Sequence, residues 1–140
     1  MTIKHEIILS YTKDLSVETP DAESLIAARE NISKYSLKLD LNSTALKNKM
    51  IEVETKLTYE DKNKNNKKTF FEMIYATVVK IDEKNPNPEE IKKFILCDLQ
   101  IKIYPQIEKI FLQVLKLSGF PDLQLNSKID FNKLYNERKN

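Results

Sequence analysis

The chain has 140 residues, which is the size of one folded domain that needs no disulfide or metal for stability, and its net charge is +2. One cysteine, one histidine and one glycine exclude an internal disulfide, a zinc site built from Cys and His, and a glycine-rich phosphate loop, so we expect no cofactor. Because the basic residues are nearly all lysine, we expect no nucleic-acid partner. No segment resembles a signal peptide or a membrane span, so we expect no membrane insertion and a cytoplasmic location.

The first segment of the chain alternates apolar and polar residues. From residue 3 to residue 11, the side chains of Ile3, Ile7, Leu9 and Tyr11 are expected to share one face of a strand. Residues 12–18 extend this strand after a bulge, and Pro20 ends it. A polar connection with weak helical character then leads to the next strand.

Two further strands are predicted over 35–42 and 51–59. In both segments apolar residues alternate with polar ones, which indicates antiparallel strands with one solvated face. The following segment, 61–68, is rich in Asn and Lys. We interpret it as a solvated hairpin loop rather than as a basic binding patch.

The fourth predicted strand, 70–81, is apolar on both faces. One face carries Phe70, Ile74, Ala76 and Val78, and the other carries Phe71, Met73, Tyr75 and Val79. A strand of this kind is covered on both sides. In a domain with one sheet, the second cover is expected to come from a loop, a subunit or a client.

The second half of the chain is predicted to be helical. Pro88 begins a helix that runs to about Gln100, and Pro105 is expected to begin a second helix that stops before Gly119. A short last helix is expected from Phe131 onward. Strands followed by helices predict an α+β fold: a four-stranded antiparallel sheet backed by two or three helices, in a single domain over 1–140.

The sequence contains no convincing catalytic set. Cys97 lies in an apolar helical segment, which favours a small buried residue over a nucleophile. Acidic pairs such as Glu52 with Glu54 lie on the solvated face of a strand, where charge is expected in any case. We therefore expect a binding protein rather than an enzyme.

Several segments resemble the SecB family of preprotein-export chaperones. Residues 11–20 resemble the first strand of that family, and 38–41 resemble its second strand. Near the C-terminus, 119–125 and 129–135 resemble its closing loop and last helix, and the pair 104–105 matches an aromatic–proline pair that opens the long helix. The chain departs from the family in its fourth strand, where Ala-Thr-Val stands in place of the usual glycines.

The resemblance implies an ATP-independent holdase that binds unfolded preproteins and delivers them to the SecA motor for export. It also implies a homo-oligomer, assembled as a dimer of dimers. By the same resemblance, Asp14 and Glu18 on the first strand, with Phe70 and Glu72 on the fourth, match a SecA-docking surface. An acidic rim around an apolar residue suits a positively charged partner.

A holdase that binds many sequences recognises apolar burial and extended backbone rather than particular side chains. The candidate residues of its client groove are Leu25, Ile26, Tyr35, Phe71 and Tyr75. For each of them, packing in the core is an equal alternative. The sequence also leaves open a SecB-like chaperone dedicated to a single partner, such as an antitoxin, and a structural protein without client binding.

Overall fold

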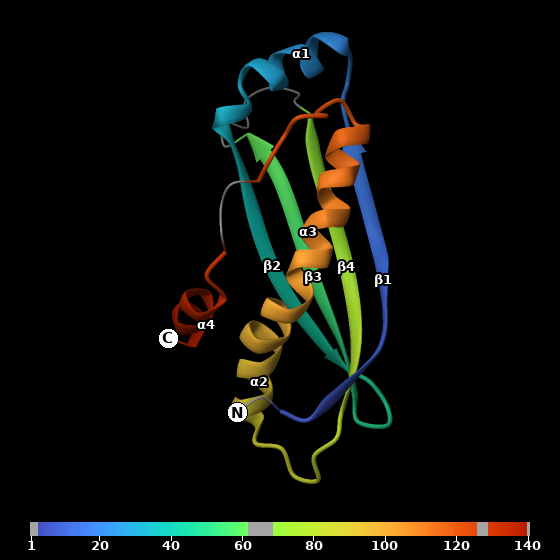
Figure 1. Ribbon diagram of the computed structural model, residues 1–140, viewed down its shortest axis with the longest axis vertical. Helices are drawn as coiled ribbons and strands as arrows, with labels where there is room; N and C mark the ends of the chain where they lie inside the picture. Colours follow the sequence, from blue (N-terminus) through green and yellow to red (C-terminus); the bar gives the residue numbers. More distant parts are fainter. Residues whose placement is uncertain (1–2, 62–68, 126–128, 140) are drawn as a thin grey trace.

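A computed structural model of the protein describes residues 3–61, 69–125 and 129–139. Its centre is a four-stranded antiparallel sheet with the strand order β1-β4-β3-β2 (Figure 1). The strands are β1 (His5–Glu18), β2 (Tyr35–Ala45), β3 (Met50–Asp61) and β4 (Phe70–Ile81). Because β1 and β2 lie at opposite edges, the chain crosses the end of the sheet between them, through α1 (Ala22–Glu30) and the 3₁₀ turn η1 (Ile32–Lys34).

The alternation along β3 is that of a strand covered on one face. Val53, Thr55, Leu57 and Tyr59 are buried, while the residues between them are partly exposed. This pattern, the single sheet and the helical cover agree with the α+β fold predicted from the sequence, which is confirmed.

β1 contains two β-bulges, at Ile8 and at Lys13, where its register with β4 shifts. Ile7 lies on the face toward the helices, whereas Leu9 and Tyr11 lie on the opposite face. The prediction that these apolar residues share one face is therefore wrong. The extra residue at Ile8 reverses the alternation, and alternation alone cannot reveal it.

The helical half consists of α2 (Pro88–Lys93), the π-helical segment η2 (Phe94–Asp98), α3 (Leu99–Leu117) and α4 (Phe131–Lys139). The first three follow one another without leaving helical backbone angles, so the predicted helix start at Pro105 is wrong. A proline inside a helix removes one hydrogen bond, here to the carbonyl of Ile101, and costs about 3 kcal/mol. Burial of Ile103, Ile107 and Phe111 on the same helix offsets this cost.

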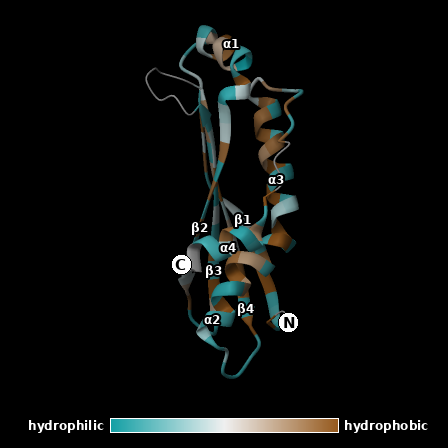
Figure 2. Cartoon of the chain, turned by 90° about the vertical axis from the view of Figure 1, so that its left-hand side faces the viewer, coloured by the Kyte–Doolittle hydropathy of each residue, from teal (hydrophilic) through white to brown (hydrophobic). Residues whose placement is uncertain are grey.

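The hydrophobic core lies between the sheet and α3. Its fully buried side chains include Leu57, Phe71 and Phe111, from β3, β4 and α3 respectively. Apolar residues follow α3 along one side of the sheet in Figure 2. α4 packs on η2 and α3, where the rings of Tyr104 and Phe131 lie 5.4 Å apart. The helices thus cover one face of the sheet, and none of the described helices packs on the opposite face.

Gly119, the one glycine of the chain, ends α3 with a φ of +111°. A β-carbon at this position would lie 2.9 Å from Cδ1 of Leu25, so the loop after α3 packs directly against α1. We expect Gly119→Ala to lower the free energy of unfolding by about 1–3 kcal/mol, because alanine at positive φ is strained. Urea denaturation measures this loss. Adding Leu25→Ala should restore only the part of this lost stability that comes from the clash with Leu25. A Gly119→Ala variant as stable as the wild type would contradict the strained backbone at this position.

Candidate functional site

The four residues predicted to dock SecA lie together on the face of the sheet opposite the helices, which we call the outer face. Glu18 pairs with Phe70 across β1 and β4, and Asp14 and Glu72 lie at neighbouring positions of the same two strands. Asp14 and Glu18 are exposed, and Phe70 and Glu72 are half-buried. The register therefore gathers into one surface residues that are far apart in the sequence.

Acidic side chains outnumber basic ones on the outer face, although the whole chain has a net charge of +2. The acids of these strand positions are Glu6, Asp14, Glu18, Asp40, Glu52, Glu54, Glu60 and Glu72. The lysines are Lys13, Lys38, Lys56 and Lys80. The charges of the chain are thus distributed unevenly, and the outer face is its acidic side.

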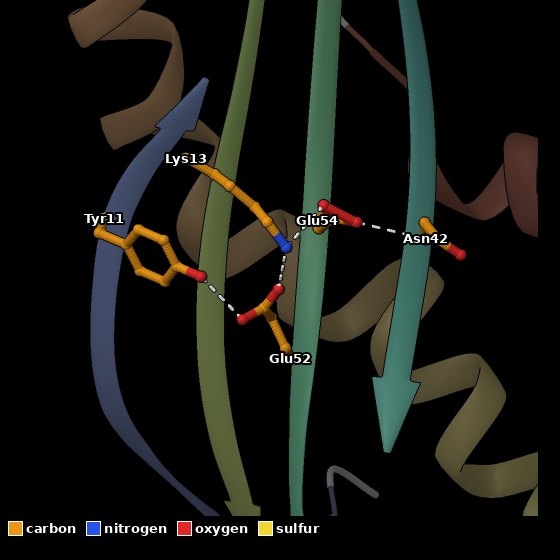
Figure 3. Close-up of polar contacts among 5 residues, drawn as sticks. All are labelled: Tyr11, Lys13, Asn42, Glu52 and Glu54. Atoms are coloured by element: carbon orange, nitrogen blue, oxygen red, sulfur yellow. Dashed lines mark hydrogen bonds and ion pairs between the residues drawn. The ribbon is translucent and has the colours of Figure 1, made fainter. Parts of the chain in front are cut away.

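At the middle of the outer face, Lys13 joins β1 to β3 (Figure 3). Its Nζ lies 2.6 Å from Oε1 of Glu52 and 3.2 Å from Oε2 of Glu54, and these contacts raise the pKa of the lysine. The hydroxyl of Tyr11 donates a hydrogen bond of 2.8 Å to Glu52. This network crosses β4 at Ala76, which is fully buried. The cover that the sequence led us to expect from a loop, a subunit or a client is supplied here by the sheet itself.

Lys56 of β3 lies beside the predicted docking residues. Its Nζ is 2.7 Å from Oε1 of Glu72. The pKa of Lys56 is raised by this hydrogen bond and by the charge of Glu72, with smaller contributions from Asp40 and Asp14. Sequence reasoning missed Lys56, because alternation places it on the solvated face without showing that it lies diagonal to Glu72.

A cavity of about 470 Å³ lies between the crossover connection and the loop after α3. Its lining residues are Arg29, Ile32, Tyr59, Phe120, Pro121, Asp122, Leu123 and Gln124. The rings of Tyr59 and Phe120 are buried, while Arg29 and Asp122 are exposed. The cavity is open to solvent, and it combines aromatic rings in its wall with polar and charged groups around them.

Two of the predicted groove residues lie behind this cavity. The ring of Tyr35 is 5.4 Å from that of Tyr59, and the ring of Phe71 is 5.4 Å from that of Phe120. Phe71 is fully buried, and Tyr35 donates a hydrogen bond of 2.6 Å to the carbonyl of Thr69. Burial, aided by the charge of a nearby aspartate, raises the pKa of Tyr35 to about 12. Both side chains support the cavity rather than line it.

The other three predicted groove residues are spread over the fold. Leu25 is half-buried over the loop after α3, and Ile26 is 57% exposed on α1. Tyr75 lies on the helix-covered face of β4. None of the five predicted residues lines the cavity. Its own apolar residues come from η1, β3 and the closing loop, and only the SecB-like loop motif at 119–125 could have pointed to any of them.

Within the described ranges, no three His, Cys, Asp or Glu residues are grouped closely enough to hold a metal ion. No helix in the same ranges has the length and apolar character of a membrane span. Cys97 is buried, burial raises the pKa of its thiol, and its Sγ lies 3.0 Å from Oδ1 of Asn132. Its observed contact is therefore with α4.

Comparisons with known proteins identify the family of this chain. The family model described as preprotein translocase subunit SecB matches residues 2–140. A protein of Pelagibacter ubique (strain HTCC1062) that is named as a protein-export protein SecB is 47% identical to this chain over 140 residues, which cover 100% of both chains. The protein-export protein SecB of Rickettsia bellii (strain OSU 85-389) is 33% identical over 129 residues, covering 91% of this chain and 83% of that protein.

Among solved structures, this chain is similar to a SecB-like chaperone of Mycobacterium tuberculosis in complex with a peptide from an antitoxin. The TM-score is 0.64 at 13% sequence identity, covering 89% of this chain and 90% of that one, so the fold is shared. Together with the family match over nearly the whole length, these similarities show that the chain belongs to the SecB family of protein-export chaperones.

Proposed function

We propose that the protein is an ATP-independent holdase, which binds unfolded preproteins in the cytoplasm and delivers them to the SecA motor for export. The observation that carries client binding is the open cavity of about 470 Å³, whose wall includes the rings of Tyr59 and Phe120. A pocket of this size accepts an apolar side chain of an extended polypeptide. Loop residues such as Pro121 and Leu123 form part of its wall, and loops can adapt to different clients.

The solved relative from Mycobacterium tuberculosis carries a bound peptide, which supports peptide binding as a property of this fold. That peptide comes from an antitoxin. A chaperone dedicated to one partner is therefore the second candidate function for this chain. The number of clients that it binds separates the two functions.

Delivery to SecA is supported by the outer face. Glu18 pairs with the half-buried Phe70, Glu72 is the next residue of β4 on the same face, and Asp14 pairs with Ile74 further along the two strands. Complementary charge steers the association of proteins and fixes their register, while burial of an apolar residue adds affinity. A positively charged segment of SecA is the partner that this surface suits.

We also propose that the protein assembles as a homo-oligomer, with a dimer of dimers as the full assembly. β1 is an edge strand, so one side of its backbone has no partner strand within the described chain. Leu9, Leu15 and Val17 on this strand are 49%, 46% and 37% exposed. An exposed apolar edge is a template for pairing with another strand, which a second copy can supply.

Light scattering tests the holdase directly. Several unrelated proteins are diluted from denaturant, without ATP, in the presence and absence of the chain. We expect near-stoichiometric amounts of the chain to suppress aggregation of most of these clients. Suppression for one client alone would favour the dedicated chaperone. Aggregation unchanged for every client tested would contradict the general holdase and leave the chaperone dedicated to a single partner.

A further inference from the structure

The proposed docking surface holds a cation of its own. The ammonium of Lys56 lies 2.7 Å from Oε1 of Glu72. Lys56 belongs to β3, which lies between β2 and β4, and the predicted docking residues are on β4 and on the adjacent β1. Lys56 pairs with Ile74 on one side and with Asp40 on the other, and Ile74 in turn pairs with Asp14. The lysine therefore stands among three carboxylates, two of which are predicted docking residues.

This position conflicts with the recognition of a positively charged partner. A lysine or arginine of the partner that binds Glu72 must share or displace the ammonium already there, and like charges so close repel each other. The ion pair is open to solvent, since the side chains of Lys56 and Glu72 are 41% and 27% exposed. Exposed ion pairs contribute little to stability, so a partner can displace Lys56 without disturbing the fold.

We propose that Lys56 is a specificity-determining residue of the SecA-docking surface, which competes with the basic side chains of the partner for Glu72 and so limits their affinity. The inference rests on the proposed SecA docking. A weakly basic segment cannot displace Lys56, whereas a segment with several lysines or arginines gains enough elsewhere on the surface to do so. Lys56 thus makes the surface selective for a strongly basic partner.

The test compares SecA binding by the wild type and by Lys56→Met, measured by isothermal titration calorimetry with SecA of the same organism. Methionine keeps the apolar part of the side chain that lies beside Ile74. The matched control is Lys38→Met, which removes the same charge from the same face. Lys38 is 72% exposed, and its Nζ is 3.9 Å from Oδ2 of Asp40.

We expect Lys56→Met to bind SecA about three- to tenfold more tightly than the wild type, and Lys38→Met to differ by less than about twofold. In a Glu72→Gln background, Lys56→Met should gain no more than the control. The gain should also shrink at high ionic strength, because salt screens exposed charges.

Equal gains in Lys56→Met and Lys38→Met would overturn the proposal, since net charge alone would then explain them. Weaker binding by Lys56→Met would also overturn it, because the lysine would then hold Glu72 in place for docking. In both cases SecA docking itself would stand. Absence of binding by the wild type and by Lys56→Met would overturn SecA docking and this proposal together, whereas the aggregation assay would still report on the holdase.

Discussion

Replacing Asp14 and Glu72 by lysine is expected to abolish SecA binding and to leave the binding of unfolded clients intact. Both carboxylates lie on the outer face. In the wild type the ammonium of Lys56 is 2.7 Å from Oε1 of Glu72, so Glu72→Lys also places a second ammonium beside the first. Reversing charges that face a basic partner turns attraction into repulsion. We expect the dissociation constant to rise at least about 100-fold, as for the loss of close interfacial charge pairs. Calorimetric titration with SecA measures it.

The matched control reverses two acids outside the outer face. Glu30 at the end of α1 and Glu137 in α4 are both exposed, so Glu30→Lys with Glu137→Lys changes the net charge by the same amount. This control should keep most of its affinity for SecA. Equal losses in both double variants would reduce the effect to net charge. Unchanged SecA affinity in Asp14→Lys with Glu72→Lys would remove the docking assignment.

The fold was largely predictable because its strands have simple patterns. β3 alternates along its whole length, and β4 is apolar on both faces, as expected for a central strand. The errors have local causes. The bulge at Ile8 changes the parity of β1, and Pro105 is tolerated inside α3 because the helix is buried on both sides of it. Neither effect is visible in a pattern of residue types.

The candidate site was less predictable, because its parts meet only in the folded chain. Asp14 and Glu72 were named by resemblance, and the register of β1 and β4 shows that they are neighbours. Lys56 escaped prediction because its partner stands on the adjacent strand. Tyr59 and Phe120 line one cavity, but Tyr59 belongs to β3 and Phe120 to the loop after α3, far along the sequence. Phe120 reaches the cavity only because α3 ends just before it.

Leu123→Asp is expected to weaken the binding of unfolded polypeptides at least about tenfold. Leu123 is half-buried in the lining of the cavity, where an aspartate would bring a charge into contact with an apolar client. Charge in an apolar contact carries a desolvation cost, and the loss of one apolar anchor commonly weakens binding by this amount. Fluorescence anisotropy of a labelled, permanently unfolded polypeptide measures the affinity, and circular dichroism checks that the variant is folded.

Two matched variants decide how far the client-binding surface extends. Leu46, 42% exposed in the connection between β2 and β3, lies at the other end of the sheet, so Leu46→Asp should bind clients as the wild type does. Ile26, 57% exposed on α1, is a predicted groove residue outside the cavity lining. If Ile26→Asp weakens binding as Leu123→Asp does, the client covers α1 as well as the cavity. If only Leu123→Asp weakens it, the cavity is the site, and a folded Leu123→Asp variant with unchanged affinity would exclude the cavity.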